Sequence, residues 1–174
     1  MRQWRRVVAG AAAVGLAAVS LTGCTQGYPD LRAGNQNACT GMPDLAVGEA
    51  LVVGAPMTVV GGPVTLESID LIDAEGVELV GAYVLSMSDD DLERYGGGIG
   101  TMLLDDPYDF WHLRVPLEGS TVEAGPTSSV NLALARTGDD PGRVDAFRIT
   151  YRSADGTPRQ TDGEFRVRLG GDCD

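Results

Sequence analysis

Alternating apolar and polar residues dominate the C-terminal third of the chain. Three runs carry an apolar side chain at every second position, at residues 130–135, 147–152 and 165–169. A period of two places one set of side chains on a buried face of a β-sheet and the other set on a solvated face. The pair Asp155-Gly156 starts the connection between the last two runs and is typical of a turn. The pattern predicts antiparallel strands.

Short apolar runs separated by turn residues continue through the rest of the domain. The expected strands are residues 45–53, 57–60, 64–72, 77–85 and 110–115. The stretch from Asp73 to Gly76 separates two of them and suits a tight hairpin loop. In the last run, Trp111, Leu113 and Val115 are expected on one side of a strand. About seven or eight short strands without a convincing helical period predict an antiparallel β-sandwich, with a closed barrel as the alternative.

The N-terminal 23 residues have a different pattern. Arg2, Arg5 and Arg6 precede an uninterrupted run of 15 apolar and small residues, from Val7 to Leu21. A positively charged segment followed by a short apolar segment is the pattern of a secretory signal. The run is shorter than the roughly 20 apolar residues that a membrane-spanning helix needs. Residues 1–23 therefore predict export of the chain.

The apolar run is followed directly by Leu21-Thr22-Gly23-Cys24. Together with the preceding segments, this resembles the lipobox of bacterial lipoproteins over residues 1–24. The resemblance implies that the signal is removed before Cys24 and that the Cys24 thiol is diacylated. It also implies that the protein is held on the extracytoplasmic face of the cell membrane, because two acyl chains give stable anchoring. An ordinary signal with a chance cysteine is the alternative.

The mature chain divides into a tether and a domain. Residues 24–38 hold the lipidated cysteine and a stretch without apolar periodicity, which predicts a flexible tether. Residues 39–174 are expected to fold as one domain. Its Gly- and Pro-punctuated strands between two cysteines resemble the immunoglobulin-like domains of uncharacterised actinobacterial lipoproteins. The resemblance implies an immunoglobulin-like β-sandwich, and the absence of Lys favours a GC-rich genome of that kind.

Two cysteines remain once Cys24 carries lipid. These are Cys39 and Cys173, at the two ends of the domain. The compartment outside the membrane is oxidising, so an even pair predicts a disulfide. A loop of that length is worth about 4–5 kcal/mol in the chain-entropy picture. Metal ligation is the alternative, but it calls for more Cys or His neighbours than a chain with one His offers.

Acidic residues outnumber basic ones, and the formal net charge is −12. Loss of the three signal arginines makes it −15, which argues against a nucleic-acid partner. Seven of the ten mature arginines follow residue 130. Four of them alternate with apolar residues and are expected on one sheet face: Arg148, Arg152, Arg166 and Arg168. This face is a candidate surface for an acidic partner or for the acidic part of the same domain, with a solvated outer face as the alternative.

Clustered carboxylates surround a glycine-rich stretch at residues 95–100. They are Asp89, Asp90, Asp91, Glu93, Asp105, Asp106 and Asp109. Because Ca²⁺ takes six to eight oxygen ligands, these residues are candidates for a calcium site, although their spacing does not fit an EF-hand. Solvated loops are the alternative. The glycine-rich stretch lacks the Lys of a phosphate-binding loop and is expected to be a mobile loop.

Residues suited to catalysis are few. His112 is the single imidazole, and no Ser stands in a nucleophile-elbow context. The widely spaced Met57, Met87 and Met102 do not favour a copper site. We therefore expect no enzyme and no cofactor. The leading hypothesis is a non-catalytic binding or accessory module of the cell envelope, with an envelope protein or ligand as partner. The alternative is a lipoprotein that binds a small ligand or Ca²⁺.

Overall fold

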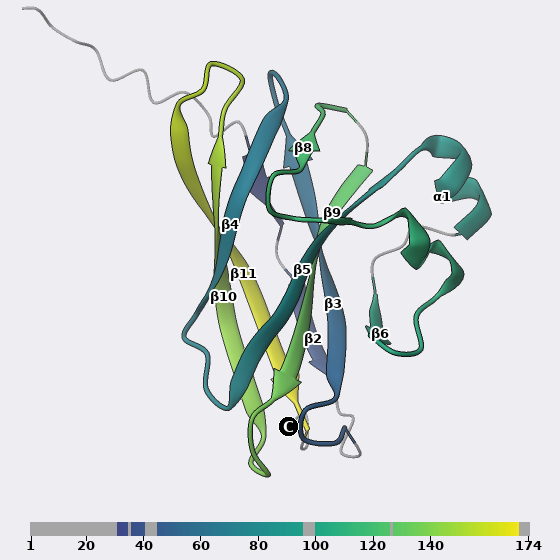
Figure 1. The fold of residues 1–174 in the computed structure, drawn as a ribbon, viewed down its shortest axis with the longest axis vertical. Helices are drawn as coiled ribbons and strands as arrows, with labels where there is room; N and C mark the ends of the chain where they lie inside the picture. Colours follow the sequence, from purple (N-terminus) through teal and green to yellow (C-terminus); the bar gives the residue numbers. More distant parts are fainter. Residues whose placement is uncertain (1–30, 35, 41–44, 96–99, 126, 171–174) are drawn as a thin grey trace, which may run out of the picture.

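Two β-sheets face each other and enclose a shared apolar core (Figure 1). The structure is a computed structural model that describes residues 31–34, 36–40, 45–95, 100–125 and 127–170. Eleven strands and two short helices lie within these described residues. The chain is therefore an all-β sandwich, as the alternating pattern predicts.

Sheet A has the strand order β1-β3-β9-β5-β7, and β6 pairs with residues 51–53 of β3. All of its neighbouring strands are antiparallel. The strands are β1 (Leu31–Ala33), β3 (Ala50–Val59), β5 (Val77–Met87), β6 (Thr101–Leu103), β7 (Val115–Pro116) and β9 (Thr127–Arg136).

Sheet B has the strand order β2-β11-β10-β4-β8. Its strands are β2 (Gln36–Thr40), β4 (Val64–Ile72), β8 (Thr121–Val122), β10 (Gly142–Arg152) and β11 (Pro158–Leu169). Strand β2 runs parallel to β11, whereas the other neighbours in this sheet are antiparallel.

The order of the strands along the chain identifies the topology. The first strand is divided, since β1 joins sheet A and β2 joins sheet B. The second to seventh long strands are then β3, β4, β5, β9, β10 and β11. If the long strands are numbered one to seven along the chain, sheet A holds strands one, two, five and four (β1, β3, β9 and β5). Sheet B holds strands seven, six and three (β11, β10 and β4). This arrangement is that of an immunoglobulin-like sandwich.

The core is formed by the inward residues of the long strands. The apolar residues at alternate positions of 147–151 and 165–169 are fully buried, as predicted. Phe147 and Phe165 meet edge to face with ring centroids 5.4 Å apart, which is a favourable aromatic geometry. Sheet A contributes the buried side chains of Leu51, Val53, Ala55, Val130, Leu132 and Leu134.

The predicted turn at Asp155-Gly156 joins β10 and β11, which pair as an antiparallel hairpin. Asp155 Oδ1 accepts hydrogen bonds from Ser153 Oγ at 2.6 Å and from the Thr157 backbone N–H at 2.9 Å. These hydrogen bonds lower the pKa of Asp155 to about 2. Gly156 has a φ of 81°, a left-handed conformation that favours glycine.

The expectation of a solvated face at 130–135 is wrong, because β9 is buried on both of its faces: Asn131, Ala133 and Ala135 are as buried as the core residues between them. A segment that we call the outer segment, residues 88–95 and 100–114, lies beside sheet A (Figure 1): it joins the edge of β3 through residues 101–103 and packs Trp111 on the outer side of the sheet. It includes α1 (Asp89–Tyr95), β6 and the 3₁₀ helix η1 (Asp109–Leu113). Trp111 of η1 clusters with Val52, Met102 and Ala133. The small side chain of Ala133 leaves room for the indole ring.

A buried arginine ties together the loops at one end of the sandwich. Arg136 closes β9 and is 8% exposed. Its Nη1 donates to the Leu45 carbonyl oxygen at 3.0 Å, and its Nη2 donates to the carbonyl oxygens of Asp139 and Asp140. Because these acceptors come from two separate loops, the guanidinium fixes both loops to the end of β9.

The prediction of two runs at 45–53 and 57–60 is wrong, because β3 is one continuous strand from Ala50 to Val59. Gly54 and Pro56 lie within it. The Pro56 carbonyl accepts a hydrogen bond from the Gly34 N–H at 2.7 Å. The backbone polar groups of Pro56 therefore point to the edge of β3 that faces β1, and not to the edge that pairs with β9. The missing N–H therefore removes no bond to β9, and the strand tolerates the proline.

The predicted hairpin at Asp73 to Gly76 is also wrong. Strand β4 belongs to sheet B and β5 to sheet A, so the turn crosses between the two sheets. Asp73 and Gly76 do take left-handed φ values of 51° and 63°. Turn residues reverse the chain, but they do not decide with which strand each arm pairs.

Two further expectations fail at the outer segment and the tether. The expected strand at 110–115 is η1 followed by β7, since the Trp111 N–H bonds to the Tyr108 carbonyl in a tight turn. Residues 31–33 and 36–38, expected within the tether, belong to β1 and β2. A single buried Leu31 among polar residues gives no periodic signal. Residues 1–30, including Cys24, lie outside the described residues.

Candidate functional site

The four arginines expected to share a face do so. Arg148 and Arg152 lie on β10, Arg166 and Arg168 lie on β11, and all four alternate with the buried core residues of sheet B. Arg166 is exposed and stands opposite Asn37 of β2 in the strand register. The period of two thus predicts correctly which side chains share the outer face.

The face is nevertheless mixed in charge. Arg148 Nε and Nη2 donate to both carboxylate oxygens of Asp162 at 2.7 and 2.8 Å. This contact lowers the pKa of Asp162 and raises the pKa of Arg148. The other two pairs are Arg152 with Glu67 at 2.6 Å and Arg168 with Asp145 at 3.1 Å. Carboxylates on the same face therefore neutralise most of the arginine charge, and a uniformly basic surface does not form.

The acidic cluster at 89–93 begins a helix that the sequence pattern did not predict. Ser88 Oγ accepts from the Asp91 N–H at 3.2 Å, and an Asp91 carboxylate oxygen accepts from the Ser88 N–H at 3.1 Å. This reciprocal arrangement is a capping box. Together with a 2.6 Å hydrogen bond from Ser88 Oγ, it lowers the pKa of Asp91. The spacing Ser-x-x-Asp was the available signal for the helix.

The calcium candidates do not assemble into a metal site in the part of the chain that the structure describes. Asp89, Asp90 and Glu93 are exposed on α1, Asp105 and Asp106 are exposed between β6 and η1, and Asp109 is exposed at the start of η1. Within the described ranges, no three His, Cys, Asp or Glu side chains are placed to hold one ion. Of the cysteines, Cys39 lies in β2, whereas Cys24 and Cys173 fall outside the described residues.

Aromatic side chains gather in the outer segment. Trp111 is 2% exposed. Its ring meets that of Tyr83 edge to face, with ring centroids 5.2 Å apart, and the Arg114 guanidinium lies 4.9 Å from the Trp111 ring centroid. The ring centroid of Phe110 lies 6.3 Å from that of Tyr95 and 5.6 Å from that of Tyr108. Trp111 therefore anchors the segment, and Tyr108 is its most exposed large aromatic side chain. The sequence pattern assigned Phe110 and Trp111 to a strand and missed the cluster.

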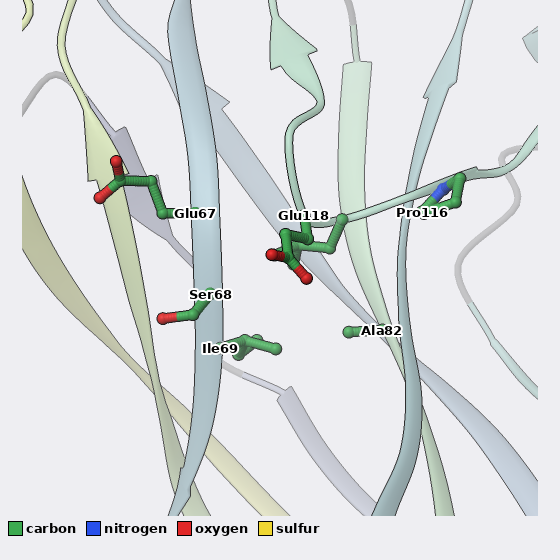
Figure 2. Close-up of a pocket in the computed structure, with 7 residues that line it drawn as sticks. Glu67, Ser68, Ile69, Ala82, Pro116 and Glu118 are labelled. Atoms are coloured by element: carbon green, nitrogen blue, oxygen red, sulfur yellow. The ribbon is translucent and has the colours of Figure 1, made fainter.

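A cleft opens between the edges of the two sheets. It has a volume of about 360 Å³ and is lined by Glu67, Ser68 and Ile69 of β4, Ala82 of β5, and the segment Pro116 to Glu118. Figure 2 shows Ile69 and Ala82 pointing toward one another across the gap, with Glu118 between the two strands and Glu67 pointing away. The cleft thus combines an apolar floor with one carboxylate directed at its mouth.

The cleft owes its position to residues 117–119, which connect the two sheets and which we call the bridge. The Leu117 N–H donates to the Ala82 carbonyl oxygen of sheet A at 3.0 Å, and the Gly119 N–H donates to the Leu66 carbonyl oxygen of sheet B at 2.8 Å. The side chain of Leu117, which is part of this bridge, is buried at 2% exposure. The bridge closes the mouth of the sandwich at that level and leaves it open beside Ile69 and Ala82.

Sequence reasoning did not single out the cleft residues. Ile69 and Ala82 lie in correctly predicted strands, but their proximity depends on β4 and β5 belonging to different sheets. The chain matches no protein family, no curated protein and no solved structure. Among the described residues, no helix is long and apolar enough to cross a membrane.

Proposed function

We propose that the chain is a lipid-anchored, extracytoplasmic binding module of the cell envelope and that it performs no catalysis. The observation that carries the proposal is the cleft between β4 and β5, with its apolar floor and its carboxylate. Its volume is at the lower end of the range of about 300–1,000 Å³ typical of ligand pockets. A site of that size suits a side chain of a partner protein better than a whole solute molecule.

The anchor part of the proposal rests on residues 1–24. A charged segment, an apolar run and Leu21-Thr22-Gly23-Cys24 stand in the order of a lipoprotein signal. Cys24 precedes β1 by only seven residues, which span at most about 25 Å when extended. A lipid on Cys24 therefore keeps the sandwich beside the membrane surface, where an envelope partner is met.

A disulfide between Cys39 and Cys173 is part of the same proposal. Cys39 pairs with Arg168 in the parallel register of β2 and β11, and Cys173 follows the end of β11 by four residues. Four residues reach about 14 Å, which is enough to bring the two cysteines within bridging distance. Alkylation of the mature protein without reductant should leave both thiols unmodified, and their modification under those conditions would contradict the bridge.

The anchor is tested by metabolic labelling with a palmitate analogue in a bacterium that lipidates its own lipoproteins. The wild-type protein and Cys39→Ser should carry the label and sediment with membranes, whereas Cys24→Ser should do neither. Cys39→Ser is the matched control because it also removes one thiol. Label on Cys24→Ser, or an unlabelled wild type, contradicts the anchor.

Binding is tested by placing a photo-crosslinking amino acid at one position on each of three surfaces. Ser68 stands beside the cleft, Tyr108 is on the outer segment, and Arg166 is on the outer face of sheet B. Irradiation of intact cells should give a discrete adduct from at least one position. If none of the three positions yields an adduct, the chain is not a binding module.

A further inference from the structure

We infer that the cleft receives a Lys or Arg side chain from an extended segment of a partner protein, whose backbone pairs with the free edge of β4. The inference rests on the proposed function and specifies the chemistry of its partner. It depends on one juxtaposition: an unpaired stretch of strand edge lies directly beside an apolar cleft that ends in a carboxylate.

The edge of β4 is open over much of its length. Strand β8 pairs only with Val64 and Thr65, and the bridge adds hydrogen bonds at Leu66. From Ser68 to Ile72, β4 pairs in regular register with β10 on one side, and no described strand lies on its other side. A strand edge with unpaired N–H and C=O groups accepts an added strand, which is a common mode of peptide recognition.

The cleft beside this edge has the chemistry of a site for a basic side chain. Ile69 and Ala82, both partly exposed, offer apolar surface to the methylene stem of a Lys or Arg. Such side chains pack their stems on apolar surface and keep the charged head near water. Glu118 is exposed and makes no ion pair within the described residues, so its carboxylate is available to that head.

The charges along the edge select the partner. Between residues 67 and 80 the chain has five acidic residues and no basic one. Glu67 and Glu75 are already paired with Arg152 and Arg143, but Asp70 and Glu78 make no ion pair among the described residues. Pairing of β4 with a second copy of itself would place like charges opposite one another, which is unfavourable. A basic extended segment is the complementary occupant.

The probe is a fluorescent peptide of about eight residues that alternates Thr and Val and carries one central Lys. Its fluorescence anisotropy is titrated with the mature lipoprotein in detergent micelles. One comparison peptide replaces Lys by norleucine, which keeps the stem without the charge. A second keeps Lys but has N-methyl groups along one backbone edge, which prevents strand pairing. Glu118→Gln is the test variant and Glu164→Gln, an exposed carboxylate on β11, is its matched control.

The lysine peptide should bind about three- to fivefold more weakly to Glu118→Gln than to the wild type, as for an exposed ion pair, and equally to Glu164→Gln. N-methylation should weaken binding by about tenfold or more, because each lost backbone hydrogen bond contributes. Equal binding of the lysine and norleucine peptides, or no rise in anisotropy at protein concentrations up to about 1 mM, overturns the inference. Lipidation and crosslinking are separate readouts, so that failure would leave the proposed function standing.

Discussion

Replacing Trp111 by Ala removes the anchor of the outer segment. The ring is 2% exposed and rests on Val52 and Ala133. These residues lie in β3 and β9, each of which is paired on both sides, so the sheet cannot move to fill the space. Deletion of a buried Trp ring costs about 3–5 kcal/mol, and a rigid floor favours the upper part of that range. We expect a loss of about 4 kcal/mol in unfolding free energy.

Urea unfolding of the mature protein, followed by circular dichroism, measures the loss. For a chain of this length the same change lowers Tm by about 10 °C. Limited proteolysis should also show faster cleavage within residues 88–114. Tyr108→Ala is the matched control, because that ring is 56% exposed and its loss should change stability by less than about 0.5 kcal/mol. A loss below about 1 kcal/mol for Trp111→Ala would refute the placement of the indole ring against sheet A.

Three more predictions concern the sandwich itself. Arg136→Met removes a buried guanidinium that donates to three backbone carbonyls and should cost about 1–3 kcal/mol in urea unfolding; an unchanged midpoint contradicts this. Gly163→Ala places a Cβ 2.5 Å from Phe147 Cζ and should cost about 1–3 kcal/mol. Gly138→Ala meets nothing within 4 Å and serves as the control in the same thermal melts. Asp155, with its pKa lowered to about 2, stabilises the fold above the unfolded pKa near 3.9, and this contribution is lost as pH falls through 2. The stability difference between wild type and Asp155→Asn should therefore shrink with acid, and a difference that is constant with pH would exclude the proposed hydrogen bonding.

Local patterns predicted the strands well where burial is one-sided. The alternation at 147–152 and 165–169 places Arg148 and Arg166 on the outer face, as the structure confirms. The same reasoning failed at 110–115, because Trp111 is buried by a tight 3₁₀ turn that has no period of two. It also missed that carboxylates accompany the arginines, since Asp162 reaches Arg148 only through the strand register. Pairing between strands is a long-range property that a local pattern does not contain.

The wrong hairpin prediction and the candidate site have one cause. Had β4 and β5 paired across Asp73 to Gly76, their edges would satisfy each other and no cleft would open beside Ile69. Because β4 pairs with β10 and β5 with β9, each has its other edge on the same side of the sandwich, and among the described residues the short strands β8 and β7 cover only two residues of each edge. The bridge near Leu117 joins these edges over only a few residues, and the rest stays open to solvent. The crossing of one short turn between the sheets therefore creates both the unpaired edge and the cleft beside it.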